Sequence, residues 1–146
     1  MDLRAIRNAL AAQIKDNVAR DVTVYPYDPG PTRQPPCVVI EPGEPFAEYH
    51  TDFGASGIDV LLEVVVHVQA SDELSKRIAL DDFCSDIGAS SISRAVEINK
   101  STTAGALGGL VDDIVCDRAH RPVPAPDTDA LTVTFDLRAL ARKEPI

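Results

Sequence analysis

The chain has 146 residues, of which 45% are hydrophobic and 25% charged, and it carries 14 Lys and Arg against 23 Asp and Glu. This composition is typical of one globular domain and argues against a largely disordered chain. The formal net charge of −9 argues against a protein that grips nucleic acid, because phosphate binding needs a clustered positive face.

Charge and hydropathy vary along the chain. Residues 1–20 and residues 138–146 each carry a net charge of +2, so residues 21–137 carry −13. Such an asymmetry fits either solvated faces or complementary surfaces between identical subunits. No apolar run approaches the ~18 residues of a membrane-spanning helix. The N-terminal segment also lacks the apolar stretch of a signal peptide, so we expect neither feature.

The first predicted element is an amphipathic helix over residues 2–19. Its apolar stripe recurs at spacings of 3, 4, 4 and 4 and consists of Leu3, Ile6, Leu10, Ile14 and Val18. A short strand is predicted at 22–25, followed by a loop over 28–36 that holds four prolines. The next strand is predicted at 37–41, buried on both faces and closed by Pro42 and Pro45.

The strongest β pattern follows a segment without a clear period. Residues 43–57 are predicted to form a long extended hairpin arm or a loop. From 58 to 70 every even position is apolar, and the odd positions are half polar. A strand of that length spans about 40 Å, which exceeds what one small domain uses for its own core. Part of it is therefore expected to project or to meet another subunit.

A second helix is predicted over residues 71–88, with Ser71 as its N-cap and Gly88 at its end. One apolar stripe is expected to face the core and contains Leu80, Phe83, Cys84 and Ile87. Leu74 and Ile78 fall on a different side of the helix. The helix is therefore predicted either to be sandwiched or to offer a second apolar patch to a partner.

The C-terminal part is predicted to hold a short helix at 91–98, a loop at 100–109, a strand at 110–120, a proline-rich turn at 121–129 and a strand at 131–139. The resulting order is α-β-β-β-α-α-β-β. This order predicts a single α+β domain over residues 1–146, with a mostly antiparallel sheet flanked by two to three helices.

The sequence holds no motif that predicts catalysis, a cofactor or a metal site. Glycine-rich phosphate loops and the usual hydrolase and metalloprotease patterns are absent. The doublets Asp81-Asp82 and Asp112-Asp113 diverge on a helix or a strand and do not form a metal site unaided. Cys37, Cys84 and Cys116 have no CxxC spacing and are expected to be buried, reduced thiols. We therefore predict a protein that is not an enzyme.

The histidines are also expected to be non-catalytic. His67 lies on the half-polar face of the long strand beside Glu63, so it is predicted to be a surface or interface side chain. His50 falls in the predicted arm and His120 at a strand end, and both are expected to be solvated.

The order of segments resembles that of the tail terminator proteins of bacteriophages with long, non-contractile tails, especially phages of actinobacteria. The basic N-terminal helix is followed by the block VTVYPYDPGPTRQPPCVVIEP. The spacing Tyr49, Phe53, Gly54 and Gly57 then leads into the strand IDVLLEVVVHVQASD. An ALDDF helix, a SISRAV helix and the strand LTVTFDLRAL complete the order.

This resemblance implies a structural virion protein without a catalytic site. Members of the family form a six-subunit ring that caps the head-proximal end of the tail tube and stops its polymerisation. The implied partners are further copies of the chain, the major tail tube protein and the head–tail connector or stopper protein. Genomic DNA would pass through the channel without specific binding, and assembly would take place in the bacterial host cytoplasm, with no cofactor and no membrane.

Two alternatives remain open at this point: another neck or head–tail connector component of the phage, and a small-ligand binding module. The features that favour a ring are the over-long strand, the predicted arm and an acidic body suited to a channel that repels phosphate. The candidate subunit-interface residues are Leu74, Ile78, Tyr49, Phe53, His67 and Glu63.

Overall fold

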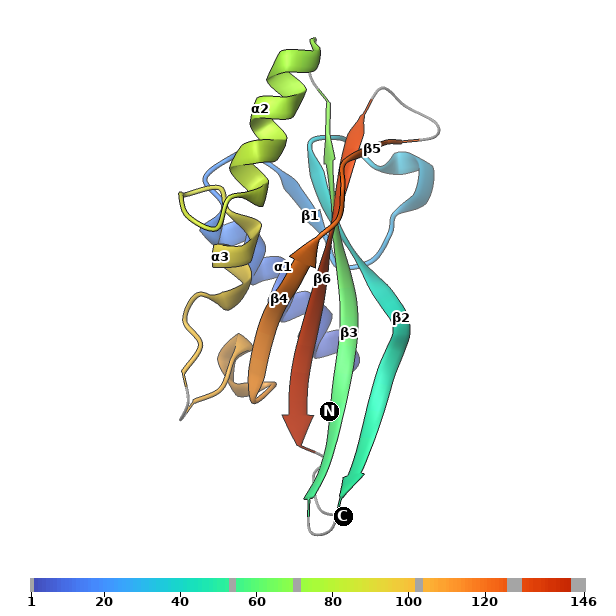
Figure 1. The fold of residues 1–146 in the computed structure, drawn as a ribbon, viewed down its shortest axis with the longest axis vertical. Helices are drawn as coiled ribbons and strands as arrows, with labels where there is room; N and C mark the ends of the chain where they lie inside the picture. Colours follow the sequence, from blue (N-terminus) through green and yellow to red (C-terminus); the bar gives the residue numbers. More distant parts are fainter. Residues whose placement is uncertain (1, 53–54, 70–71, 102–103, 126–129, 143–146) are drawn as a thin grey trace.

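The computed structural model describes residues 2–52, 55–69, 72–101, 104–125 and 130–142. It contains the helices α1 (Leu3–Asn17), α2 (Glu73–Cys84) and α3 (Ile92–Glu97), the 3-10 turns η1 (Gly30–Thr32) and η2 (Leu107–Gly109), and the strands β1 (Thr23–Tyr25), β2 (Cys37–Asp52), β3 (Ala55–Val68), β4 (Asp113–Ala119), β5 (Val123–Pro124) and β6 (Leu131–Arg142). These strands form one sheet in the order β1-β2-β3-β6-β4, and β5 also pairs with β6. All pairings are antiparallel except β1 with β2. The predicted α+β class is therefore confirmed (Figure 1).

The helices pack against one face of the sheet and leave the other face without helical cover. The even residues of β3 from Val60 to Val68 are buried, together with alternate residues of β6 from Leu131 to Ala139. They pack in one hydrophobic cluster with apolar side chains of α1, α2 and α3. The predicted stripe of the first helix supplies the part from Ile6 to Ile14, and Asp2 caps this helix by accepting a hydrogen bond from the Ala5 N–H at 3.1 Å. All three helices therefore cover one face, and the odd residues of β3 point to the other.

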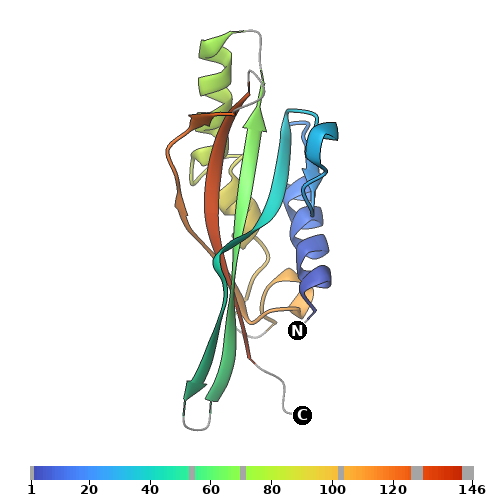
Figure 2. The same ribbon diagram turned by 90° about the vertical axis from the view of Figure 1, so that its right-hand side faces the viewer.

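The β2–β3 hairpin is the arm that the sequence analysis left as one of two options. Its pairing runs without interruption from Ala47 with Val60 to Asp52 with Ala55. In Figures 1 and 2 this ribbon extends along the long axis beyond every helix. The prediction that Pro42 ends the strand is wrong, because the register shifts between Pro42 and Ala47 and the strand continues after the bulge. Gly43 permits this close approach, since a Cβ there would lie 2.9 Å from the Cβ of Leu61.

α2 is shorter than predicted at both ends. Asp72, not Ser71, is its N-cap, and the Asp72 carboxylate accepts a hydrogen bond from the Ser75 N–H at 2.8 Å. Ser71 itself lies outside the described residues. The helix ends at Cys84, because Ser85 is extended and both its N–H and its hydroxyl donate to the Asp81 carbonyl. Ile87 therefore lies beyond the helix and is 76% exposed instead of contributing to the core stripe.

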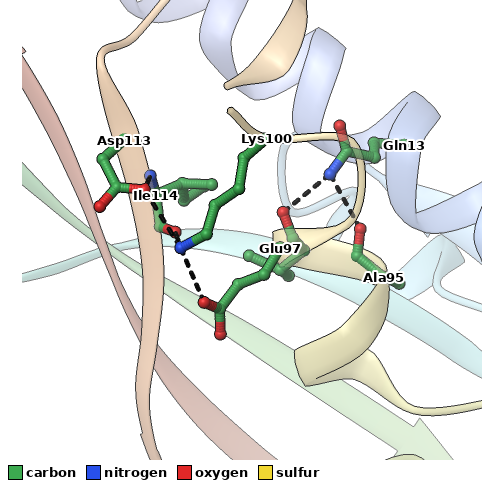
Figure 3. A network of polar contacts seen from close by, with 7 residues as sticks. Gln13, Ala95, Glu97, Lys100, Asp113 and Ile114 are labelled. Carbon is green, nitrogen blue, oxygen red and sulfur yellow. Dashed lines mark hydrogen bonds and ion pairs between the residues drawn. The ribbon is translucent and has the colours of Figure 1, made fainter. Parts of the chain in front are cut away.

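α3 is fixed between α1 and the edge of the sheet by a polar network (Figure 3). The Gln13 amide of α1 donates to the carbonyls of Ala95 and Val96 at 2.9 and 2.7 Å. On the other side, the Lys100 Nζ contacts Glu97 Oε1 at 2.9 Å, Asp113 Oδ1 at 3.1 Å and the Ile114 carbonyl at 3.0 Å. These carboxylates raise the pKa of Lys100. Lys100 therefore covers the outer edge of β4 near the start of the strand, at Asp113 and Ile114.

The C-terminal strands follow the prediction with smaller differences. β4 starts three residues later than the predicted strand, and α3 is one residue shorter at each end than the predicted helix. The predicted turn at 121–129 contains β5, whose Val123 pairs with Thr132. β6 shows the predicted alternation, with Val133, Phe135 and Leu137 buried on the helix side.

Candidate functional site

The face of the sheet that the helices leave open carries rows of carboxylates. Glu41 of β2, Glu63 of β3 and Asp136 of β6 are direct partners in the register. A lower row places Glu48 beside Asp59. Side chains at directly opposite positions lie roughly 5 Å apart, and like charges there are destabilising. Burial and the nearby carboxylates of Asp28 and Glu63 raise the pKa of Glu41. These adjacent carboxylates destabilise the fold, which indicates that the negatively charged face has a function.

A groove of about 320 Å³ crosses the middle of this open face. The β2 side of the groove contributes Gly43 and Glu44, and Leu61 and Glu63 of β3 lie between the two sides. The opposite side is where the basic groups gather, namely Arg118, His120 and Arg138. The charge therefore runs from acidic at the β2 edge towards basic at the β4 edge.

The side chains on the basic side of the groove each contact a carboxylate that also lines it. The His120 Nε2 lies 2.7 Å from Asp136 Oδ2, and the Arg118 Nε lies 3.5 Å from the same oxygen. The Arg138 Nε lies 3.5 Å from Asp117 Oδ2. The arginine side chain of Arg118 is more exposed than its carboxylate partner. His120 is exposed, as predicted, but it is paired.

A strap of residues 26–36, which includes η1, borders the upper end of the open face. The Arg33 Nη1 lies 3.3 Å from the His67 Nε2, and its Nη2 lies 3.5 Å from Asp28 Oδ1. A guanidinium can only donate, so Nε2 is the acceptor and the imidazole is neutral. Burial and then the Arg33 charge lower the pKa of His67. The predicted surface position of His67 is wrong, because the side chain is only 6% exposed.

The three cysteines differ in burial, whereas all three were predicted to be buried. Cys37 is buried, whereas Cys84 and Cys116 are only half-buried. Burial raises the pKa of Cys37 and of Cys116 to about 11 each. The thiols are therefore protonated near neutral pH and are poor nucleophiles.

Metal-ligating groups do not converge among the described residues. No group of three His, Cys, Asp or Glu within them could hold a metal ion. From the two acidic doublets, Asp82 pairs with Arg20 and Asp113 pairs with Lys100. In the same part of the chain, no helix has the length and apolar character needed to cross a membrane.

The remaining candidate interface residues lie at opposite ends of the molecule. Leu74 and Ile78 of α2 are 69% and 50% exposed, so the helix does carry an apolar patch outside the core. Tyr49 on the β2–β3 arm is 73% exposed. Phe53 lies outside the described residues. Figure 1 shows α2 at one end of the long axis and the arm at the other. Glu63 lies on β3 outside the arm, where it pairs with Glu41 and Asp136. The six residues therefore do not form one site.

The α2 patch provides a direct test of its role. Replacing Leu74→Lys and Ile78→Lys together should leave the free energy of unfolding within about 0.5 kcal/mol of the wild type, because both side chains are exposed. Self-association should weaken if the patch is an interface. Chemical denaturation and light scattering measure the two effects separately. Unchanged self-association in an assembling protein would show that the patch is not an interface.

Sequence reasoning missed the carboxylate rows and the basic side of the groove opposite them. A signal for the first was present, since residues 41–63 hold six acidic residues and no Lys or Arg. The second was not visible, because Arg118 of β4 and Arg138 of β6 come together only through the pairing of these two strands.

Comparison of the sequence with protein-family models and with curated proteins found no match.

Proposed function

We propose that this chain is a structural protein of a bacteriophage tail, the terminator that caps the head-proximal end of the tail tube as a closed ring. The observation that carries the proposal is the set of carboxylate rows on the open face of the sheet, opposite a face that all three helices cover. In a ring that turns the open face inwards, the carboxylates of β2, β3 and β6 line a channel. That wall repels DNA phosphate and lets DNA slide without adhering.

The projecting arm supports assembly into a ring over a solitary subunit. β1 covers the outer edge of β2 only along Cys37–Val39. Beyond it, β3 is the single strand that pairs with β2 among the described residues. A long open edge is an aggregation hazard for a monomer, and a closed ring removes that hazard by placing a neighbour against it. The ring number of six comes from the resemblance of the segment order to tail terminators.

The groove on the open face fits a small-ligand module less well. Its charged groups are mostly engaged with one another, as in the pairs Arg138–Asp117 and His120–Asp136. Small-molecule sites are instead largely apolar, with a few convergent polar groups. In the proposed role the partners are further copies of the chain, the tail tube protein and the head connector. The protein would be part of the virion after assembly in the host cytoplasm.

Three measurements test this function. Size-exclusion chromatography with light scattering should give a mass of six subunits, and negative-stain images should show closed rings at the head-proximal end of the tail. A persistent monomer would contradict the ring, and rings found elsewhere in the neck would favour a connector component. Removal of the gene from the phage should yield over-long tails that do not join heads. Joined tails of normal length would contradict the terminator role.

A further inference from the structure

The upper end of the open face holds a small buried cluster outside the main core. Cys37 and Val39 of β2 are buried, and so is His67 of β3, although all three helices lie on the other face of the sheet. Neither Cys37 nor Val39 belongs to the hydrophobic cluster that the helices cover. The strap of residues 26–36 lies against this cluster, since Arg33 contacts His67 and its charge acts on the Cys37 thiol. The strap therefore takes the place of a helix as the cover of this end of the sheet.

Hydrogen bonds fix both ends of the strap, and a side chain fixes its middle. The Pro26 carbonyl accepts from Arg7 Nη1 at 3.0 Å, and the Pro36 carbonyl accepts from a β1 N–H at 3.3 Å. Between these ends, the Arg33 Nη1 reaches the His67 Nε2 at 3.3 Å. Breaking that contact would loosen the middle of the strap from the sheet while its ends stay attached.

The contact between Arg33 and His67 requires a neutral imidazole. The guanidinium can only donate, so the His67 Nε2 must accept. A proton on Nε2 removes that acceptor and places a second cation beside the first at a buried position. The register partners of His67 are Cys37 and Thr132, which supply no negative charge near neutral pH. Burial and the Arg33 charge outweigh the Asp28 carboxylate and together lower the pKa of His67.

We propose that the strap is an acid-released latch, in which protonation of His67 breaks its contact with Arg33 and uncovers Cys37 and Val39. The closed strap disfavours the charged imidazole, so its stability is complete above the ordinary histidine pKa of 6.5. That stability falls as the pH drops from 6.5 towards the lowered pKa of the closed form. Within this range the open population rises by up to about tenfold per pH unit. The latch is independent of the proposed ring and is a property of the single subunit.

Glu41 of β2 is the titratable group that opposes this release. Its carboxyl contacts Asp28 of the strap, and burial followed by the carboxylates of Asp28 and Glu63 raises its pKa. Protonation of Glu41 therefore removes a repulsion from Asp28 and favours the closed strap as the pH falls. Glu41→Gln supplies a neutral side chain that forms hydrogen bonds at every pH. In this variant the acid response of the strap is left to His67.

Labelling of the Cys37 thiol with a dipyridyl disulfide measures the opening of the strap. Peptide mass spectrometry separates Cys37 from Cys84 and Cys116, and each rate is divided by the rate for the same cysteine in the urea-unfolded chain at the same pH. In Glu41→Gln, the corrected rate at Cys37 should be about five- to tenfold higher at about pH 5.5 than at about pH 7.5. Cys116 is the internal control and should not change. Its pKa is also raised to about 11, but it contacts Ser93 of α3 and not the strap.

Two further variants, made in the Glu41→Gln protein, test the role of the imidazole. His67→Gln keeps an acceptor for Arg33 but does not titrate in this range, so the acid response should fall below about twofold. His120→Gln is the matched control and should keep the full response, because His120 is exposed and contacts Asp136. Arg33→Gln removes the charge at a partly exposed position and should at least halve the response. It keeps the contact testable where His67→Gln does not fold.

Several outcomes would overturn the latch. One is a corrected Cys37 rate in Glu41→Gln that stays the same at the two pH values, and another is an undiminished response in His67→Gln or in Arg33→Gln. An equal rise at Cys116 would show general unfolding in acid instead of release of the strap. Nuclear magnetic resonance titration of the His67 ring in the wild type gives an independent readout. A titration midpoint at or above the ordinary pKa of 6.5 would contradict the latch.

Discussion

Val64→Asp is expected to leave the subunit unfolded at 25 °C. Val64 lies in the middle of β3 on the helix-covered face, is fully buried and pairs in register with Ile40 and Phe135. A carboxylate placed there has no partner and costs on the order of 5 kcal/mol. A domain of this size has a total stability of only about 5–15 kcal/mol. Far-UV circular dichroism and urea denaturation measure the effect.

Leu61→Asp is the matched control for that change. Leu61 lies three residues away on the same strand, but it points to the open face, is half-buried and has Arg138 as its register partner. The same new carboxylate should therefore cost about 1 kcal/mol or less there, since a cross-strand pair of opposite charge is favourable. A Val64→Asp protein that unfolds cooperatively at nearly the wild-type urea concentration would contradict the assignment of this face to the core.

Regular apolar periodicity predicted the elements that build the core. The first helix was placed within two residues of α1 because its stripe repeats over four turns. β6 was predicted from strict alternation over nine residues, and the even positions of β3 were assigned to the buried face. Each of these segments buries one continuous face, so local pattern and tertiary packing agree.

The predictions failed where a local signal competes with pairing at a distance. Pro42 reads as a strand end, but it lies at a bulge on β2, where the sheet tolerates a missing N–H donor. Ile87 has the spacing of the α2 stripe, yet the helix ends at Cys84, and the hydroxyl of Ser85 donates a hydrogen bond to the Asp81 carbonyl. β5 is only two residues long and exists because β6 offers it an edge. No hydrophobic periodicity in the sequence marks the bulge, the end of α2 or β5, so pattern analysis could not predict them.

The candidate site depends on register in the same way. Helical spacing alone placed Leu74 and Ile78 away from the core stripe, but it left open whether that side of the helix is sandwiched, and the packing of α2 shows that both side chains are exposed. His67 was misplaced because the strap of residues 26–36 that contacts it is a proline-rich loop without a period. The carboxylate row from Glu41 to Asp136 joins residues almost a hundred positions apart, and only the pairing of β2, β3 and β6 reveals it.

Phe83→Ala is expected to detach α2 from the body of the protein, with a loss of about 3–4 kcal/mol in the free energy of unfolding. The ring of Phe83 is buried in the core beneath α2, and the Arg20 guanidinium lies over it at 5.9 Å. Arg20 also pairs with Asp82 of the same helix. A cleft of about 260 Å³ already opens beside the ring, so water fills the truncated site and α2 loses its main apolar contact.

Hydrogen exchange distinguishes this local loss from general destabilisation. Amides of α2 should exchange faster in Phe83→Ala by a larger factor than amides of β3 and β6, because Phe83 fixes the helix and the sheet keeps its own pairing. If the patch of Leu74 and Ile78 is an interface, self-association should weaken as well, since α2 carries both residues. Ile87→Ala is the control, at a position that is 76% exposed. It should change neither the free energy of amide opening in α2 nor that of self-association by more than about 0.5 kcal/mol. Equally faster amide exchange in α2, β3 and β6 would show that α2 unfolds together with the sheet and is not a separately attached helix.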